Sequence, residues 1–100
     1  MKGYENRIAI NDTLNTLKTR VENIVIASIA DCHLNPLFEV IALQTKAAIL
    51  LKEEGLWEEG IVTNINGSVK EGIRDGLRWS KDHLHFEKTE IAEMWKKFIE

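Results

Sequence analysis

The chain has 100 residues, with 13 basic and 16 acidic side chains, so its formal net charge at neutral pH is -3. Apolar residues make up 44% of it and charged residues 29%, which is ordinary for a globular domain and excludes a disordered chain, a collagen-like chain and a polybasic nucleic-acid-binding tail. The one cysteine, Cys32, cannot form an internal disulfide, so the fold depends on its hydrophobic core. We expect a single domain spanning residues 1–100.

The apolar segments give no indication of export or membrane insertion. Residues 1–7 contain no apolar stretch typical of a secretory signal. Residues 24–30 form the longest apolar run of the first half, far short of the roughly 20 residues that cross a bilayer. With a single free cysteine, these features predict a cytoplasmic protein. The excess of isoleucine (12) over alanine (7) favours a bacterial or phage source.

Apolar residues at alternating spacings of four and three predict a long first helix. The stripe consists of Ile10, Leu14, Leu17, Val21, Ile24 and Ser28. Such a heptad pattern is typical of a seam that packs against another helix. Asn11, Asp12 and Thr13 offer an alternative N-cap, which would leave residues 4–10 as a separate arm.

The second predicted helix begins after Asn35, a good N-cap residue, with Pro36 at the first helical position. It runs through Lys52 or Glu54 and ends at Gly55, a typical residue for the position just after a helix. Its apolar residues cover most of its circumference, which implies burial on more than one side: Leu37, Val40, Ile41, Leu43, Ala47, Ala48, Leu50 and Leu51. The short connection between the first two helices predicts an antiparallel hairpin over residues 5–54.

Residues 56–68 are ambiguous. Apolar residues recur every four positions, which favours a helix, whereas Asn66-Gly67 and the strand propensity of residues 61–63 favour a β-hairpin. Because residues after the turn do not alternate cleanly, we prefer a helix, a break at Asn66-Gly67 and a further helix. A capping box at Ser68 and Glu71 then predicts that the third main helix starts at Val69.

The third predicted helix carries an apolar stripe of Val69, Ile73, Leu77 and Leu84. Gly72 and Gly76 lie one turn apart and each costs up to about 1 kcal/mol in a helix, so we expect them to allow close approach of another backbone. Thr89 is the predicted N-cap of a last short helix with one apolar face, formed by Ile91, Met94, Trp95 and Phe98.

Together these elements predict an all-α fold, a small helical bundle in which a long antiparallel hairpin packs with two shorter helices from residues 56–100. The heptad seam of the first helix and the wide apolar surface of the second predict a homo-oligomer, specifically a dimer. The predicted oligomer interface consists of Leu14, Leu17, Val21 and Ile24.

Candidate residues for catalysis or metal binding lack the necessary spacing. Cys32 and His33 are adjacent and would diverge on a helix, and His83 and His85 would need further ligands from elsewhere. No sequence feature pairs Cys32 with a histidine base. Two acidic clusters, around Trp57 and over residues 87–93, lack a matching set on a neighbouring helix and are typical of solvated helix ends. We therefore predict no catalytic residues, no metal and no cofactor.

The polar pattern with the clearest helical spacing is a basic stripe on the third helix, formed by Lys70, Arg74, Arg78 and Lys81. Together with Trp79, it is the predicted site for a partner protein or an anion. Two alternatives remain open: pairing of the arginines with Glu71 and Asp75 in the same helix, and burial of Trp79 against the first helix. The favoured function is an intracellular protein-interaction module of the adaptor, inhibitor, immunity or regulatory type. A nucleotide-, nucleic-acid- or anion-binding protein is the second hypothesis.

Overall fold

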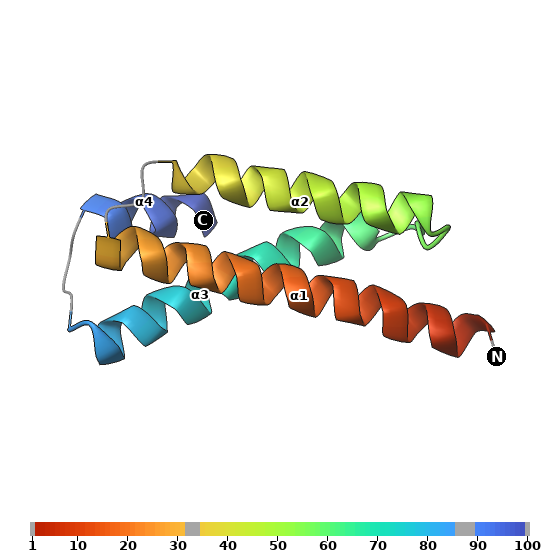
Figure 1. Ribbon diagram of the computed structural model, residues 1–100, viewed down its shortest axis with the longest axis horizontal. Coiled ribbons are helices and arrows are strands. Elements are labelled where there is room, and N and C mark those ends of the chain that lie inside the picture. Colours follow the sequence, from red (N-terminus) through yellow and green to blue (C-terminus); the bar gives the residue numbers. More distant parts are fainter. Residues whose placement is uncertain (1, 32–34, 86–89, 100) are drawn as a thin grey trace.

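The computed structural model describes the backbone of residues 2–31, 35–85 and 90–99. These ranges contain four helices and no strand: α1 (Lys2–Asp31), α2 (Pro36–Glu53), α3 (Ile61–His83) and α4 (Glu90–Ile99). They form an elongated bundle of 47 × 23 × 22 Å (Figure 1). The predicted all-α bundle is therefore confirmed.

Helices α1 and α2 form the predicted antiparallel hairpin, as Figure 1 shows. Helix α1 is continuous through residues 11–13, and the Thr13 hydroxyl donates a hydrogen bond to the Ala9 carbonyl oxygen at 3.0 Å. Thr13 therefore lies in the helix interior rather than at an N-cap, and residues 4–10 belong to α1 and do not form a separate arm.

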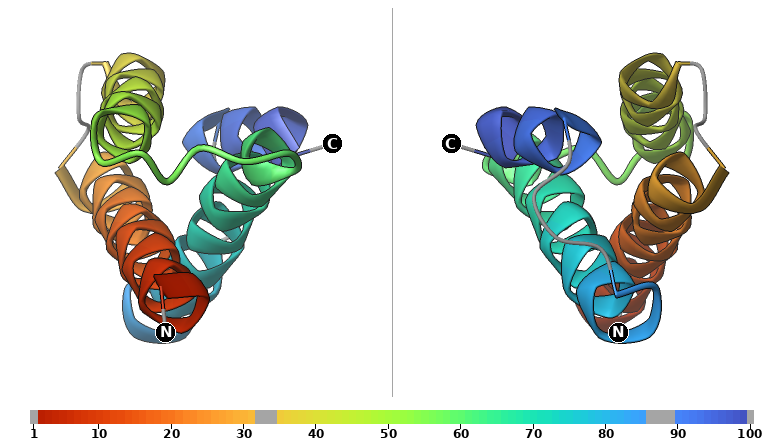
Figure 2. Two further views of the ribbon diagram at one scale, coloured as in Figure 1. Left: turned by 90° about the vertical axis from the view of Figure 1, so that its right-hand side faces the viewer. Right: turned by 90° about the vertical axis from the view of Figure 1, so that its left-hand side faces the viewer.

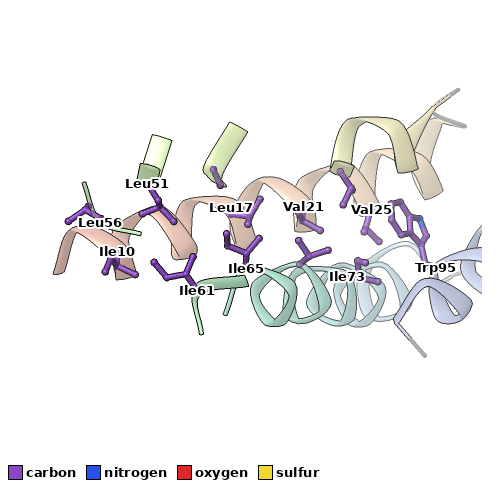
Figure 3. Packing of buried hydrophobic residues seen from close by; sticks show 13 residues of the cluster. Ile10, Leu17, Val21, Val25, Leu51, Leu56, Ile61, Ile65, Ile73 and Trp95 are labelled. Carbon is purple, nitrogen blue, oxygen red and sulfur yellow. The ribbon is translucent and has the colours of Figure 1, made fainter. Parts of the chain in front are cut away.

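The ends of α2 follow the sequence signals. Pro36 is the first helical residue after Asn35, although the Asn35 side chain makes no capping hydrogen bond. At the other end Gly55 has a positive φ of 69°, its amide donates to the Lys52 carbonyl, and the Leu56 amide donates to the Leu51 carbonyl at 2.8 Å. These two bonds define a Schellman motif, which returns the chain so that Leu56 packs beside Leu51 in the core (Figure 3).

The predicted break at Asn66-Gly67 and the predicted helix start at Val69 are wrong. Residues 54–60, including Trp57, are not helical, and α3 begins at Ile61 and continues through Asn66-Gly67 without interruption. The reason is burial, because the side of α3 that faces the core is a continuous row: Ile61, Ile65, Val69, Gly72, Ile73, Gly76 and Ser80. Packing of this row outweighs the roughly 1 kcal/mol that Gly67 costs in a helix. At 23 residues, α3 is longer than α2.

The central contact of the fold joins α1 and α3, which pack more extensively than any other pair of helices. The two helices run in the same direction (Figure 1). A Cβ atom placed on Gly72 would lie 2.6 Å from the Lys18 carbonyl oxygen, and one placed on Gly76 would lie 2.7 Å from the Val25 Cβ. The predicted close approach of another backbone at these two glycines is therefore confirmed.

Helix α4 is attached to the bundle mainly by Trp95, which is fully buried (Figure 3). Its indole Nε1 donates to the Ser28 hydroxyl at 2.8 Å, and that hydroxyl donates to the Val25 carbonyl at 2.7 Å. The Phe98 ring packs edge-on against Trp95, with ring centroids 6.3 Å apart. The predicted apolar face of the last helix is confirmed, whereas its predicted cap, Thr89, lies outside the described residues.

Two buried serines are expected to respond in opposite ways to substitution by alanine. Ser28 accepts the indole hydrogen bond, whereas the hydroxyl of Ser80 is buried without a hydrogen-bond partner in the described part of the chain. Ser28→Ala leaves the Trp95 donor unpaired and is expected to lower the free energy of unfolding by about 1–3 kcal/mol. Ser80→Ala removes an unpaired polar group and is expected to be neutral or to stabilise by up to about 1 kcal/mol. Urea unfolding of both variants measures this difference, and equal losses would contradict it.

Candidate interaction surfaces

The basic face of α3 consists of Lys70, Arg74, Arg78 and Lys81, and all four side chains are exposed. At about 100° per residue they share a sector of about 80°. The buried row that faces α1 lies on the opposite side of the helix. Burial of that row thus directs the four cations to solvent, which is the arrangement that the sequence predicts.

The alternative left open by the sequence, pairing of these arginines with acidic neighbours, is absent from the structure. Within α3, all of which is described, no carboxylate lies within ion-pair distance of a lysine or arginine nitrogen. Glu71 and Asp75 therefore do not neutralise Arg74 and Arg78, and the basic face remains available to an external anion.

Trp79 does not belong to the basic face. It lies about 100–180° around the helix from the four cations. Its ring stacks on His83 with centroids 4.3 Å apart and an angle of 12° between the planes, and it remains 38% exposed. The His83 Nδ1 lies 3.0 Å from the Trp79 carbonyl oxygen. Trp79 therefore lies on a different side of α3 from the basic face, because consecutive residues of a helix point in different directions.

The predicted oligomer interface divides into two parts. Leu17 and Val21 are buried in the core of the single chain, with Val21 against Gly72 of α3, whereas Leu14 and Ile24 are half-buried. The heptad seam is thus filled largely by α3 of the same chain, and Leu17 and Val21 are not on the surface that a second copy would meet.

A different apolar surface lies on α2. Phe38 is 73% exposed, and Ile41 and Ile49 are about half exposed. These residues are missing from the predicted site, although the apolar circumference of α2 is visible in the sequence. The structure shows which part of that circumference is exposed to solvent and which part is buried in the core.

Two adjoining hollows of about 250 and 430 Å³ lie between α1 and α2. Both are lined by Arg20, Leu43 and Lys46, and Asp12 and Glu39 each line one of them. Both are open to solvent, and their mixed charges favour no single class of ligand.

The described residues contain no cluster of three or more His, Cys, Asp or Glu side chains arranged to hold a metal ion. His83 stacks on Trp79, while His85 is exposed with a positive φ of 51°. The acidic residues around Trp57 are exposed, and Lys52 lies 4.6 Å above the Trp57 ring. Cys32, His33 and Glu87 lie outside the described residues.

Comparison of the chain with models of protein families, with curated proteins and with solved structures finds no match. The function must therefore be argued from these surfaces. None of the helices, as far as the chain is described, is long and apolar enough to cross a membrane.

Proposed function

We propose that this protein is a small cytoplasmic interaction module, without catalytic activity of its own, that binds an acidic partner protein through the basic face of α3. The observation that carries the proposal is the exposure of four cations on one side of a helix, with no carboxylate of that helix in ion-pair distance. The chain as a whole is acidic, with a net charge of -3, so its overall composition does not account for a local basic surface.

The spacing of the basic face favours a partner with a regular array of carboxylates. From Lys70 to Lys81 the face extends about 16 Å along the helix axis. A partner helix with acidic side chains at intervals of three or four residues matches this spacing. Several simultaneous charge contacts then provide specificity and fast association rather than large affinity from any one pair.

A phosphate-bearing ligand is the second candidate, because the guanidinium groups of Arg74 and Arg78 are suited to bidentate contacts with phosphate oxygens. The net negative charge of the chain repels any anionic partner at long range, and it repels a nucleic acid most, because duplex DNA carries one negative charge per about 1.7 Å of its axis. An acidic protein therefore remains the preferred partner.

The double variant Arg74→Glu/Arg78→Glu tests the proposal. We expect partner binding to fall by about 10- to 100-fold, because two attractive contacts become repulsive. The melting temperature should change little, because both side chains are exposed and form no ion pair within α3. The measurement is an affinity pull-down with mass spectrometry of both the protein and the nucleotide fractions, repeated at low and high salt.

The matched control is Arg7→Glu/Arg20→Glu on α1, which changes the net charge equally at two other exposed positions. The control should retain the partner if recognition is local to α3. Undiminished capture of the partner by the α3 double variant would contradict the proposal. Loss of a nucleotide or nucleic acid instead of a protein from the eluate would select the second candidate.

A further inference from the structure

The charge of α3 and of the turn before it changes along the chain. Glu58 and Glu59 belong to this turn, where the Ile61 amide donates a hydrogen bond to the Glu58 carbonyl at 3.3 Å. We call these two exposed glutamates the acidic turn. Residues 60–69 contain no charged side chain, and the basic face follows over residues 70–81. The order of charges along α3 is therefore acidic, neutral and basic.

The acidic turn and the basic face have complementary charges but cannot meet within one chain. The centre of the basic face lies about 20 Å from the acidic turn along the axis of α3. Neither glutamate of the turn lies within ion-pair distance of a lysine or arginine nitrogen in the described part of the chain. The basic face has no carboxylate of α3 within that distance either. Both charged regions can therefore contact another molecule.

Gly67 lies between these two regions, in the same sector of the helix as the basic face. Gly72 and Gly76 are explained by their contacts with α1, whereas a Cβ atom placed on Gly67 would meet no atom within 4 Å. Glycine is less stable than alanine in a helix interior, and nothing within the chain requires it here. In the end-on views no other described helix covers this side of α3 (Figure 2). Gly67 therefore leaves room for the backbone of a second molecule.

We propose that α3 of a second copy of this chain packs antiparallel against α3, with a two-fold axis at Gly67. The proposal rests on the proposed function, because it gives the basic face an acidic occupant, and it names that occupant as the acidic turn of the second copy. Residue 67 is midway between Glu59 and residues 75–76, the centre of the basic face. The axis thus brings the acidic turn of each copy to the basic face of the other, and a surface complementary to itself forms a closed two-fold dimer.

The charges select the antiparallel orientation. A parallel pair of α3 helices would place basic face beside basic face and acidic turn beside acidic turn, which is unfavourable. An antiparallel pair with its axis inside the basic face would also bring like charges together. Only an axis in the uncharged segment, residues 60–69, opposes unlike charges. Asp75 lies about 100° around the helix from Arg74, so it does not face the incoming acidic turn.

The contact area and the nature of the contacts set the strength of the dimer. One pair of helices buries less than the roughly 800 Å² per partner of a standard stable interface. The main contacts are between exposed charges, which salt screens. The dimer is therefore reversible, with a dissociation constant on the order of 10–100 µM at low salt and a weaker one at high salt.

Analytical ultracentrifugation from about 1 to about 300 µM, in about 50 mM salt, tests the association. The wild-type chain is expected to shift with concentration from 11.5 kDa to about twice that mass. Arg74→Glu/Arg78→Glu is expected to weaken association at least about tenfold. The matched control is Arg7→Glu/Arg20→Glu on α1, which changes the net charge equally and should still dimerise.

A wild-type monomer at about 300 µM would overturn the dimer. A dimer that Arg74→Glu/Arg78→Glu weakens no more than the α1 control would overturn it as well. The proposed function is tested separately, because loss of a captured acidic protein from the α3 variant would support it even if the wild-type chain were a monomer.

A charge exchange tests whether the acidic turn and the basic face touch. Glu58→Lys/Glu59→Lys is expected to be as defective in association as Arg74→Glu/Arg78→Glu, while helical circular dichroism confirms that both variants fold. A mixture of the two variants is expected to form a dimer, because both symmetric contacts then join unlike charges. A mixture that remains monomeric would overturn the contact.

Cysteine cross-linking tests the position of the axis, in a Cys32→Ser background that removes the native thiol. Like residues meet at a two-fold axis, so Gly67→Cys chains are expected to form disulfide-linked dimers on oxidation. Thr63→Cys chains should not, because like positions then lie about 12 Å apart along the helix axis, beyond disulfide reach. Equal cross-linking of the two variants, or none above the level of Thr45→Cys on α2, would overturn the antiparallel arrangement.

Discussion

Gly72→Ala is expected to lower the free energy of unfolding by about 2–3 kcal/mol, although alanine is the best helix former and glycine among the worst. The added methyl group would lie 2.6 Å from the Lys18 carbonyl oxygen and 2.9 Å from the Val21 Cβ, so α1 and α3 must separate to admit it. Gly76→Ala faces the same obstacle at Val25. For a chain of this length the loss corresponds to a fall in melting temperature of about 8–20 °C, measured by thermal unfolding.

Gly67→Ala is the matched control, because the same substitution in the same helix meets no atom within 4 Å. There the intrinsic preference of alanine acts alone, and we expect a gain of up to about 1 kcal/mol. The two variants should therefore differ in sign. A neutral or stabilising Gly72→Ala would show that α1 and α3 do not approach as closely as described.

Trp95→Ala is expected to cost about 3–5 kcal/mol, the usual range for removal of a large buried aromatic side chain. Trp95 is fully buried, and the substitution also leaves the Ser28 hydroxyl without its donor. Because α4 has only ten residues, it is too short to remain helical without tertiary contacts. The variant should lose helical circular dichroism from α4 as well as stability.

Trp79→Ala provides the comparison for this variant, because Trp79 is 38% exposed and contacts its own helix through His83. Its loss should cost no more than about 1 kcal/mol. If both tryptophan variants unfolded at the same urea concentration, Trp95 would not be the residue that holds α4 on the bundle.

The helices whose ends are set by local chemistry could be predicted from the sequence. Asn35-Pro36 and Gly55 mark the two ends of α2, because a proline lacks the amide donor that a first helical turn leaves unused and a glycine adopts positive φ without strain. The beginning of α3 could not be predicted in the same way. Asn66-Gly67 has strong local turn propensity. The segment is helical because Ile61 and Ile65 belong to a row of α3 residues that is buried against helices distant in sequence.

The same distinction between local sequence signals and contacts distant in sequence applies to the candidate sites. Exposure of the basic face follows from helical spacing alone, so Lys70, Arg74, Arg78 and Lys81 could be predicted as a set. The heptad seam around Val21 indicates that a helix packs there, but a periodic pattern does not state whether that helix belongs to the same chain. Here α3 fills most of the seam, and exposed apolar side chains such as Phe38 and Ile41 lie on α2 instead.

The contact between α1 and α3 also determines when the protein can fold during its synthesis. Gly72 meets Val21, a residue that precedes it by about fifty positions. A nascent chain that has not yet released residue 72 from the ribosome holds α1 and α2 but lacks the surface that covers Val21 and Val25. Contacts between positions so distant in sequence form late, and until then the side of α1 that α3 covers, including Val21 and Val25, is exposed to water. The nascent chain is therefore most prone to aggregation shortly before α3 emerges.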